Sequence, residues 1–257
     1  MRPLVPPWSL TLLGYWQLTR NGEPVDVGAR QQRVITSLAL LGVRPRHFIA
    51  TMLWPDGSEM RAAGNLRAGL FRISHELPSL LCATEPLRLH DDVAVDVHRL
   101  RGLIGTILDS RDTVIPISTM EQLRTADLLP GWYEDWVVCE QELLIHERVD
   151  ALEVVAKRYL AHGDTGHALI AARAAAAVEP LRESVQLLLV RAYLAADDRA
   201  SAVRTHQDFS ATLQRELGVS PSPHFAALLR RELPSAATLS SNTAESRRAA
   251  PRALGAR

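Results

Sequence analysis

Cysteine is nearly absent from this sequence. The two cysteines, Cys82 and Cys139, lie far apart, and neither has a His or Cys neighbour at the spacing of metal ligands. This scarcity argues against a disulfide framework and against a zinc site, and it is typical of proteins in a reducing cytoplasm. We expect both cysteine side chains to pack as small apolar groups.

Long apolar runs are also missing. Residues 3–19 carry no charge, but three prolines and Gly14 interrupt them. A signal peptide needs a continuous apolar core, and a membrane helix needs about 20 apolar residues. The sequence therefore predicts a disordered start over residues 1–8, no membrane contact and a cytoplasmic location.

Motifs of catalysis are lacking as well. The sequence contains no Gly-x-Ser-x-Gly elbow, no His-Glu-x-x-His motif and no phosphate-binding Gly-x-x-x-x-Gly-Lys-Ser/Thr loop. We therefore expect no enzyme activity, no bound metal and no cofactor.

Charge is present but unevenly distributed around a formal net charge of zero. Residues 1–102 hold 12 basic and 9 acidic side chains, residues 103–233 hold 13 and 19, and residues 234–257 hold 4 and 1. A mildly basic domain before an acidic one is typical of a nucleic-acid-binding domain joined to a protein-binding domain. The Ala-, Ser- and Arg-rich segment 234–257 has no periodicity, so we expect a disordered tail.

The first part of the chain alternates short strands with helices. Asn21-Gly22 supplies the positive-φ pair of a hairpin turn between two apolar segments. Helical periodicity begins near Ala29, and Gly42 is placed to end that helix. The expected elements are strands over residues 10–13, 15–19 and 24–27, and helices over residues 29–42 and 47–53.

A third helix, expected over residues 59–81 with Ser58 as its N-cap, is the most informative segment of this half. Apolar residues recur along it in steps of three and four, which predicts one buried stripe with a polar face opposite. Strands are expected next, and three helices followed by a β-hairpin form a winged helix. The predicted stripe is Ala63, Leu66, Leu70, Ile73 and Leu77, and the predicted strands are residues 80–83, 87–90 and 93–96.

The second half is nearly all helical and contains a repeat. The segment 157–164 is followed 34 residues later by the similar segment 191–198, and a period of 34 residues is typical of tetratricopeptide helix hairpins. We expect the shared Tyr-Leu-Ala to lie where the two helices of each hairpin meet, with Leu160 and Leu194 buried. The acidic face of residues 140–153 is expected to be solvated.

Several motifs resemble the Streptomyces antibiotic regulatory protein (SARP) family, over about residues 8–233 and in the family's order. In the first half they are Leu-Trp-Pro-Asp at 53–56, Asn-Leu-Arg-Ala-Gly-Leu-Phe-Arg-Ile at 65–73, Leu-Arg-Leu at 87–89 and Val-Asp-Val at 95–97. In the second half they are Leu-Pro-Gly-Trp-Tyr-Glu-Asp-Trp at 129–136, Glu-Pro-Leu-Arg-Glu-Ser at 179–184 and Glu-Leu-Gly-Val-Ser-Pro-Ser-Pro at 216–223.

The resemblance implies a mainly α protein in two domains. An OmpR-type winged helix-turn-helix of α+β class is expected over residues 9–100. An all-α, tetratricopeptide-like bacterial transcriptional activation domain (BTAD) is expected over residues 101–233. The implied function is a transcriptional activator that binds direct repeats in promoter DNA as more than one copy. The resemblance also implies recruitment of RNA polymerase holoenzyme through sigma and other subunits, in this family often at antibiotic gene clusters.

The polar face of the third helix is the expected DNA-binding site. Arg pairs bidentately with guanine and Asn with adenine in the major groove, whereas other basic groups hold phosphates. The predicted base-contacting residues are Arg61, Asn65, Ala68 and Arg72. The predicted phosphate contacts are Arg67, His75, Arg88, Arg30 and Arg33.

Two alternatives stay open from the sequence. Family members usually have a more basic end to the recognition helix, where this chain has Ser74, His75 and Glu76. The chain is therefore alternatively a protein-interaction scaffold with a vestigial winged helix. The aromatic residues Trp132, Tyr133 and Trp136 are expected to pack the linker against the first repeat helix rather than to stack on bases.

Overall fold

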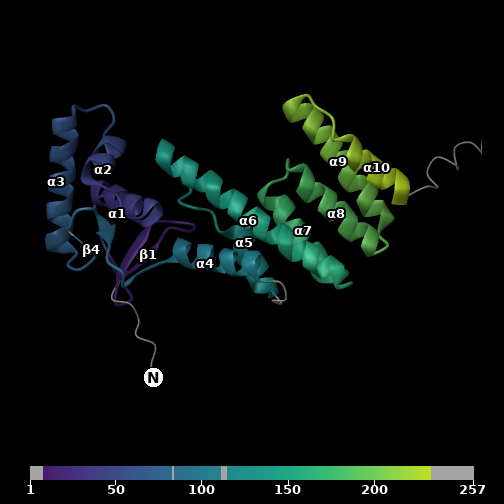
Figure 1. Ribbon diagram of the computed structural model, residues 1–257, viewed down its shortest axis with the longest axis horizontal. Coiled ribbons are helices and arrows are strands. Elements are labelled where there is room, and N and C mark those ends of the chain that lie inside the picture. Colours follow the sequence, from purple (N-terminus) through teal and green to yellow (C-terminus); the bar gives the residue numbers. More distant parts are fainter. Residues whose placement is uncertain (1–7, 83, 111–114, 233–257) are drawn as a thin grey trace, which may run out of the picture. The chain divides into compact units, whose positions relative to one another are not determined.

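The computed structural model describes residues 8–82, 84–110 and 115–232 (Figure 1). Trp8, expected in a disordered start, is the first residue of a strand. The rest of that start and the predicted tail lie outside the described residues. No helix in the described part of the chain is long and apolar enough to cross a membrane.

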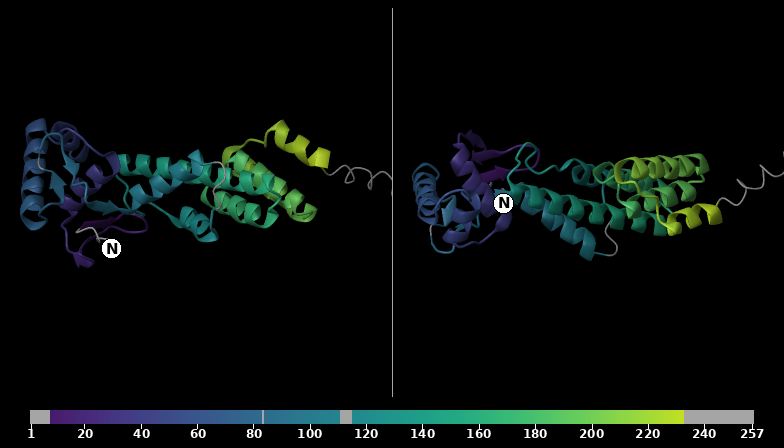
Figure 2. Two further views of the ribbon diagram at one scale, coloured as in Figure 1. Left: turned by 60° about the horizontal axis from the view of Figure 1, so that its bottom comes forward. Right: turned by 90° about the horizontal axis from the view of Figure 1, so that it is seen from above.

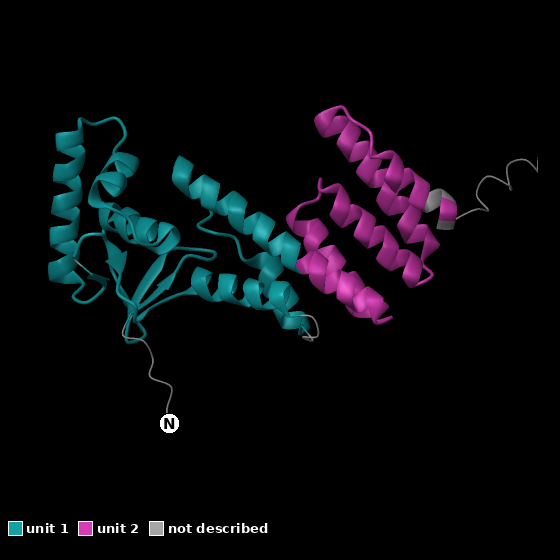
Figure 3. Ribbon diagram, in the orientation of Figure 1, with its two compact units in different colours: residues 1–151 teal, residues 152–257 magenta. Residues whose placement is uncertain are grey.

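The chain divides into two compact units, residues 1–151 and residues 152–257 (Figure 3). The boundary falls inside one long helix, α6 (Asp135–Ala161). All described strands belong to the first unit, and the second unit is helical, which confirms the predicted fold class. The domain boundary expected near residue 100 stays a prediction.

A four-stranded sheet opens the first unit. Its strands are β1 (Trp8–Thr11), β2 (Gln17–Arg20), β3 (Glu23–Val25) and β6 (Val93–Val95), in the order β3-β2-β1-β6. β6 runs parallel to β1, and the other neighbours are antiparallel. Asn21 has a φ of 51° and Gly22 a φ of 89°, so both residues between β2 and β3 adopt the left-handed conformation that the predicted hairpin turn requires.

Three helices follow the first three strands. They are α1 (Ala29–Leu41), α2 (Arg46–Leu53) and α3 (Glu59–Glu76). The predicted N-cap of α3 is confirmed, because the Ser58 hydroxyl accepts a hydrogen bond from the Arg61 backbone N–H at 3.4 Å. α3 ends before Pro78 rather than near residue 81, since proline cannot continue a helix. In every view α3 lies at the outer edge of the first unit (Figures 1 and 2).

The wing is a short hairpin. β4 (Leu81–Cys82) and β5 (Arg88–Leu89) pair antiparallel. Reciprocal backbone hydrogen bonds between Arg44 and Leu87, of 3.0 and 2.9 Å, connect this hairpin to the loop between α1 and α2. The third predicted strand, β6, leaves the hairpin and joins the sheet.

Asp96 explains why β6 joins the sheet. Its carboxylate accepts hydrogen bonds from the backbone N–H groups of Leu12 at 3.0 Å and Leu13 at 2.9 Å, just beyond the end of β1. The same residue begins α4 (Asp96–Asp109), where the helix dipole favours a negative charge. One side chain therefore connects the end of β1 to the start of α4. α5 (Ile117–Thr125) follows.

A buried arginine of α6 closes the C-terminal end of α5. The Arg148 side chain, 2% exposed, donates to the backbone carbonyls of Leu123 and Arg124 at 2.6 Å and of Ala126 at 2.9 Å. The last carbonyls of a helix have no partner within it, so Arg148 satisfies them. Burial lowers the pKa of Arg148, and the Asp127 carboxylate at 3.2 Å acts in the opposite direction.

The second unit continues with four further helices. They are α7 (Thr165–Val178), α8 (Glu183–Ala195), α9 (Arg199–Leu217) and α10 (Pro223–Glu232). α7 packs against α8, and α8 packs against α9 (Figure 2).

The predicted repeat is confirmed, and it extends to backbone hydrogen bonds. α6 and α8 end at the shared Tyr-Leu-Ala, as expected. The Asp164 backbone N–H donates to the Tyr159 carbonyl, and the Asp198 N–H donates to the Tyr193 carbonyl, both at 2.9 Å. These two hydrogen bonds close the equivalent turns between α6 and α7 and between α8 and α9.

The burial expected of two repeat leucines is wrong. Leu160 and Leu194 are half-buried, and they lie in the last turn of α6 and α8, next to the turn into the following helix. The fully buried repeat positions come earlier in each unit and on the second helix. These matched buried pairs are Val155 with Leu189, and Ala168 with Ala202.

Candidate nucleic-acid interface

The buried face of α3 differs from the predicted stripe. Ala63 is exposed and Leu70 is half-buried, so their assignment to the core is wrong. Gly69 takes their place: a Cβ added there would lie 3.8 Å from the Val34 side chain of α1. Small residues allow α3 to approach α1 closely. The buried face of α3 is therefore rotated about the helix axis relative to the predicted stripe. Its buried line is Ala62, Leu66, Gly69 and Ile73, continued by Leu77.

This rotation fixes which residues face outward. A helix turns about 100° per residue, so Gly64, Phe71 and His75 lie opposite the buried line. Arg67 and Arg72 lie on the two flanks of that outward face. α3 therefore presents a central line with basic residues on both sides.

The charges of α3 are unpaired. Arg61, Arg67 and Arg72 are exposed, and among the residues that the structure describes their guanidinium groups form no hydrogen bond or ion pair. Of the other predicted base-contacting residues, Ala68 is exposed and Asn65 is half-buried. Three arginines on one helix are thus free to bind an external anion.

The remaining predicted phosphate contacts differ in their surroundings. Arg30 is exposed at the first turn of α1. Arg88 pairs with Asp91 in the wing. Arg33 donates to the Leu53 carbonyl at 3.1 Å, and its Nε lies 3.2 Å from a Glu134 carboxylate oxygen. Because these groups already hold its guanidinium, we leave Arg33 out of the proposed DNA contacts.

His75 has a fixed position on the outward face. Its Nδ1 donates to the Phe71 carbonyl at 2.9 Å, and its ring lies 4.1 Å from the Phe71 ring, centre to centre. The imidazole therefore lies against an aromatic ring rather than extending freely.

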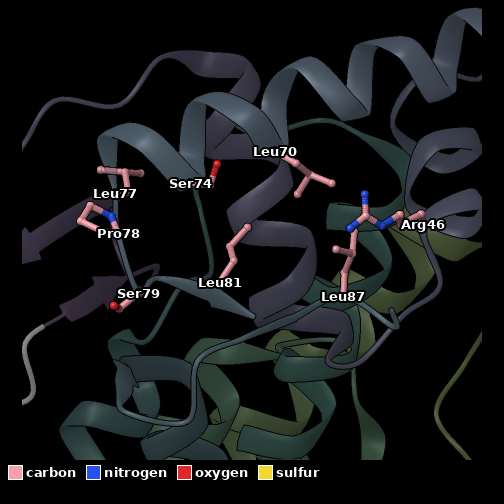
Figure 4. A pocket seen from close by; sticks show the side chains of 8 residues that line it. All are labelled: Arg46, Leu70, Ser74, Leu77, Pro78, Ser79, Leu81 and Leu87. Atoms are coloured by element: carbon pink, nitrogen blue, oxygen red, sulfur yellow. The ribbon is translucent and has the colours of Figure 1, made fainter. Parts of the chain in front are cut away.

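A hollow of about 140 Å³ separates the second half of α3 from the wing (Figure 4). Leu70, Leu81 and Leu87 give it apolar walls, and Arg46 lies at its rim. The Arg46 Nε is 3.0 Å from the Glu85 carboxylate, which also accepts the Arg46 backbone N–H at 2.9 Å. This pair holds the wing loop against the start of α2.

The second unit contains a buried carboxylate that the sequence analysis missed. Glu153, 5% exposed, accepts hydrogen bonds from Lys157 Nζ and Ser184 Oγ, both at 2.6 Å, and lies 3.3 Å from Arg182 Nε. Burial acts to raise the pKa of Glu153, but the hydrogen bonds from Lys157 and Ser184 hold it below its ordinary value. The Glu-Pro-Leu-Arg-Glu-Ser segment at 179–184 thus anchors α8 to α6. In the sequence, Arg182 and Ser184 of this segment were the available indication that it contacts a carboxylate.

The aromatic and cysteine predictions are only partly correct. Trp132 and Trp136 are half-buried, whereas Tyr133 is 83% exposed and does not pack as expected. Cys82 is half-buried, but Cys139 is exposed, so its expected packing is wrong.

Comparison with known proteins agrees with this architecture. Residues 121–233 match the model of the bacterial transcriptional activator domain family. A solved structure of Mycobacterium tuberculosis EmbR in complex with a low affinity phosphopeptide has a similar fold, with a TM-score of 0.63 and 24% sequence identity. The similarity covers 89% of this chain and 65% of the EmbR chain. No curated protein with a matching sequence was found.

These findings first define a class: a small-sheet domain with three helices and a wing, followed by a helical activator domain. Within that class, residues 121–233 carry a bacterial transcriptional activator domain, the domain that the sequence motifs implied for this part of the chain.

Proposed function

We propose that this chain is a SARP-type transcriptional activator that binds DNA sequence-specifically and places α3 in the major groove. The unpaired arginines of α3 carry this proposal, because guanidinium groups bind phosphates and pair bidentately with guanine. The fold supports it, because α3 lies at the outer edge of the first unit (Figure 1) and the face opposite its buried line is exposed.

The proposed contacts follow the two flanks of α3. Arg72 and Arg61 lie on one flank with Asn65, and these residues contact base edges together with Ala68. Arg67 lies on the other flank, where it lines a hollow with Arg46 and His47 at the start of α2. A helix N-terminus favours anions, so this flank faces a phosphate wall. The other proposed phosphate contacts are His75, Arg88 and Arg30.

The activator domain supports the rest of the proposal. The second unit contacts RNA polymerase holoenzyme, including sigma, and the winged helices of two copies bind direct repeats about one helical turn apart. The protein acts in the cytoplasm on nucleoid DNA, without enzyme activity, and its targets are genes of a specialised-metabolite cluster.

The test is selection of duplexes from a random library with the full chain, followed by titration at several salt concentrations. The full chain is required because backbone hydrogen bonds connect Leu12 and Gly14 to Leu129 and Asp127. We expect one enriched duplex, with an affinity that falls by about 0.9 log units per log unit of salt for each phosphate contact.

No enrichment, together with binding that is insensitive to salt, would contradict this proposal. That outcome would support the alternative of a protein-interaction scaffold with a vestigial winged helix. Weak binding of all duplexes with a normal salt dependence would leave only non-specific DNA binding.

A further inference from the structure

An exposed aromatic ring lies at the centre of the outward face of α3. Phe71 is 62% exposed, although Leu66, Leu70 and Ile73 beside it in α3 are buried or half-buried. The His75 ring lies against it and is held by the hydrogen bond to the Phe71 carbonyl. Ser74 Oγ donates to the same carbonyl at 2.8 Å. Phe71 is therefore held in place by its neighbours without contributing to the core.

Two residues before Phe71 on the same face, Gly64 and Ala68, are small, whereas Met60 at the start of that face is 85% exposed. Gly64 lies about two turns earlier, and a Cβ added there would meet no atom within 4 Å. A glycine inside a helix costs roughly 1 kcal/mol relative to alanine, and no internal packing requires it here. Ala68 continues this shallow surface toward the ring. The helix backbone can therefore approach an external surface closely between Gly64 and Phe71.

The charges around the ring indicate what that surface is. Arg67 and Arg72 flank Phe71 on opposite sides, and Arg61 extends the second flank. A protein partner with an apolar pocket does not require basic groups on both sides of the ring. The major groove has phosphates on both walls, and thymine places a methyl group on its floor.

We infer that Phe71 contacts the 5-methyl group of a thymine, and that Gly64 and Ala68 allow α3 to approach the groove floor closely enough for that contact. This inference rests on the proposed function. It adds an apolar contact, specific for a T·A base pair, to the polar contacts of the arginines.

The experiment compares thymine with deoxyuridine, which lacks only the 5-methyl group. Each thymine of the duplex selected by the full chain is replaced in turn, and the dissociation constant is measured for the wild type and for Phe71→Ala. For the wild type we expect a loss of roughly fourfold at one position, the factor for burying one methyl group. Phe71→Ala should bind the thymine duplex about tenfold more weakly and distinguish the two bases by less than twofold.

Matched variants separate this contact from a change in folding. Tyr15→Ala removes another exposed aromatic residue of the first unit and should leave the thymine preference intact. Gly64→Ala should raise the thermal midpoint, because alanine favours the helix, and should weaken binding of the selected duplex severalfold. Equal or tighter binding by Gly64→Ala would overturn the inferred close approach.

Three outcomes contradict the inference, and they differ from one another. Failure to enrich any duplex removes the proposed function and this contact with it. A selected, salt-dependent duplex whose thymine preference survives Phe71→Ala removes only this contact. Unchanged DNA binding by Phe71→Ala, with loss of transcription by added RNA polymerase, would assign the ring to a protein partner.

Discussion

The arginines of α3 differ from Arg101, Arg148 and Arg182 in how their guanidinium groups are bound. Arg61, Arg67 and Arg72 have no partner among the described residues, whereas Arg101 of α4 binds Glu140 at 2.8 Å and Glu147 at 3.0 Å. Burial opposes the charge of Arg101, but the hydrogen bonds to these two carboxylates raise its pKa. Arg148 and Arg182 are held similarly, by carbonyls and by Glu153. The α3 arginines are therefore dispensable for folding, and the others are part of the fold.

The largest effect on stability is expected from Arg148→Met. The substitution leaves the carbonyls of Leu123, Arg124 and Ala126 buried without their donor, and unpaired buried groups cost about 1–3 kcal/mol each. We expect urea unfolding to show a loss of about 3 kcal/mol. Arg124→Ala is the control, because its side chain is exposed and, among the residues that the structure describes, pairs with Glu121. Equal unfolding midpoints for the two variants would show that Arg148 does not hold α5.

The repeat predicts a smaller effect that depends on position. Leu189→Ala removes a buried side chain between the helices of the second unit and should cost about 2–3 kcal/mol. Leu194→Ala removes a half-buried side chain one turn later and should cost roughly half of that. Thermal unfolding of both variants measures the difference. A larger loss for Leu194→Ala would mean that the register of the repeat is misassigned.

Removal of a base contact should affect binding and leave folding unchanged. Arg72→Ala is expected to cost about 1–3 kcal/mol of affinity on the selected duplex and to reduce discrimination at one base pair. Its thermal midpoint should equal that of the wild type, because Arg72 is exposed and unpaired. If Arg72→Ala instead weakens selected and scrambled duplexes equally, Arg72 contacts phosphate.

The smallest effect concerns acid stability of the second unit. Asp198 caps α9 by accepting the Ser201 backbone N–H at 3.0 Å, and hydrogen bonds from Ser201 hold the pKa of its carboxyl below the ordinary value. A carboxyl with a lowered folded-state pKa stabilises the fold above about pH 3.9, and this stability is lost as the pH falls through the folded-state pKa.

Asp198→Asn preserves a capping oxygen but removes the charge that titrates. We expect the thermal midpoint of the wild type to exceed that of Asp198→Asn at pH 7, with the difference shrinking as the pH falls toward 3. Asp208→Asn, in the middle of α9, is the control. A difference that grows in acid would reverse the sign of the effect.

Local features of the sequence predicted much of the fold. The hairpin turn at Asn21-Gly22, the N-cap Ser58 and the helix end before Pro78 depend on neighbouring residues, so residue type predicts them. The helix hairpins of the second unit follow from the 34-residue period. The rotation of α3 does not, because a hydrophobic pattern favours Leu70 over Gly69 as the buried residue. That choice depends on how closely α1 approaches, which is a property of two segments far apart in the sequence.

Several charged residues have partners far away in the sequence, so the sequence did not predict their roles. Residues 140–153 have the sequence of a solvated acidic face, yet Glu140 and Glu147 bind Arg101, and Glu153 is buried. From the sequence, Arg33 is a candidate phosphate contact, whereas in the structure its Nε lies 3.2 Å from the Glu134 carboxylate. Of the candidate site, the sequence identified the helix, its exposed arginines and the position of Phe71 opposite the apolar stripe. It did not identify a role for that ring, because an aromatic residue on a helix has no DNA contact as specific as that of arginine with guanine.

The most direct test of these two kinds of arginine is the salt dependence of DNA binding by Arg67→Ala and Arg182→Ala. Both are measured in the full chain, alongside the thermal midpoint. We predict that Arg67→Ala lowers the salt slope by about 0.9 and leaves the midpoint unchanged, because it removes one phosphate contact. Arg182→Ala should leave the slope unchanged and lower the midpoint, because it removes a partner of the buried Glu153. An unchanged slope for Arg67→Ala together with a lowered midpoint would contradict the assignment of α3 to DNA.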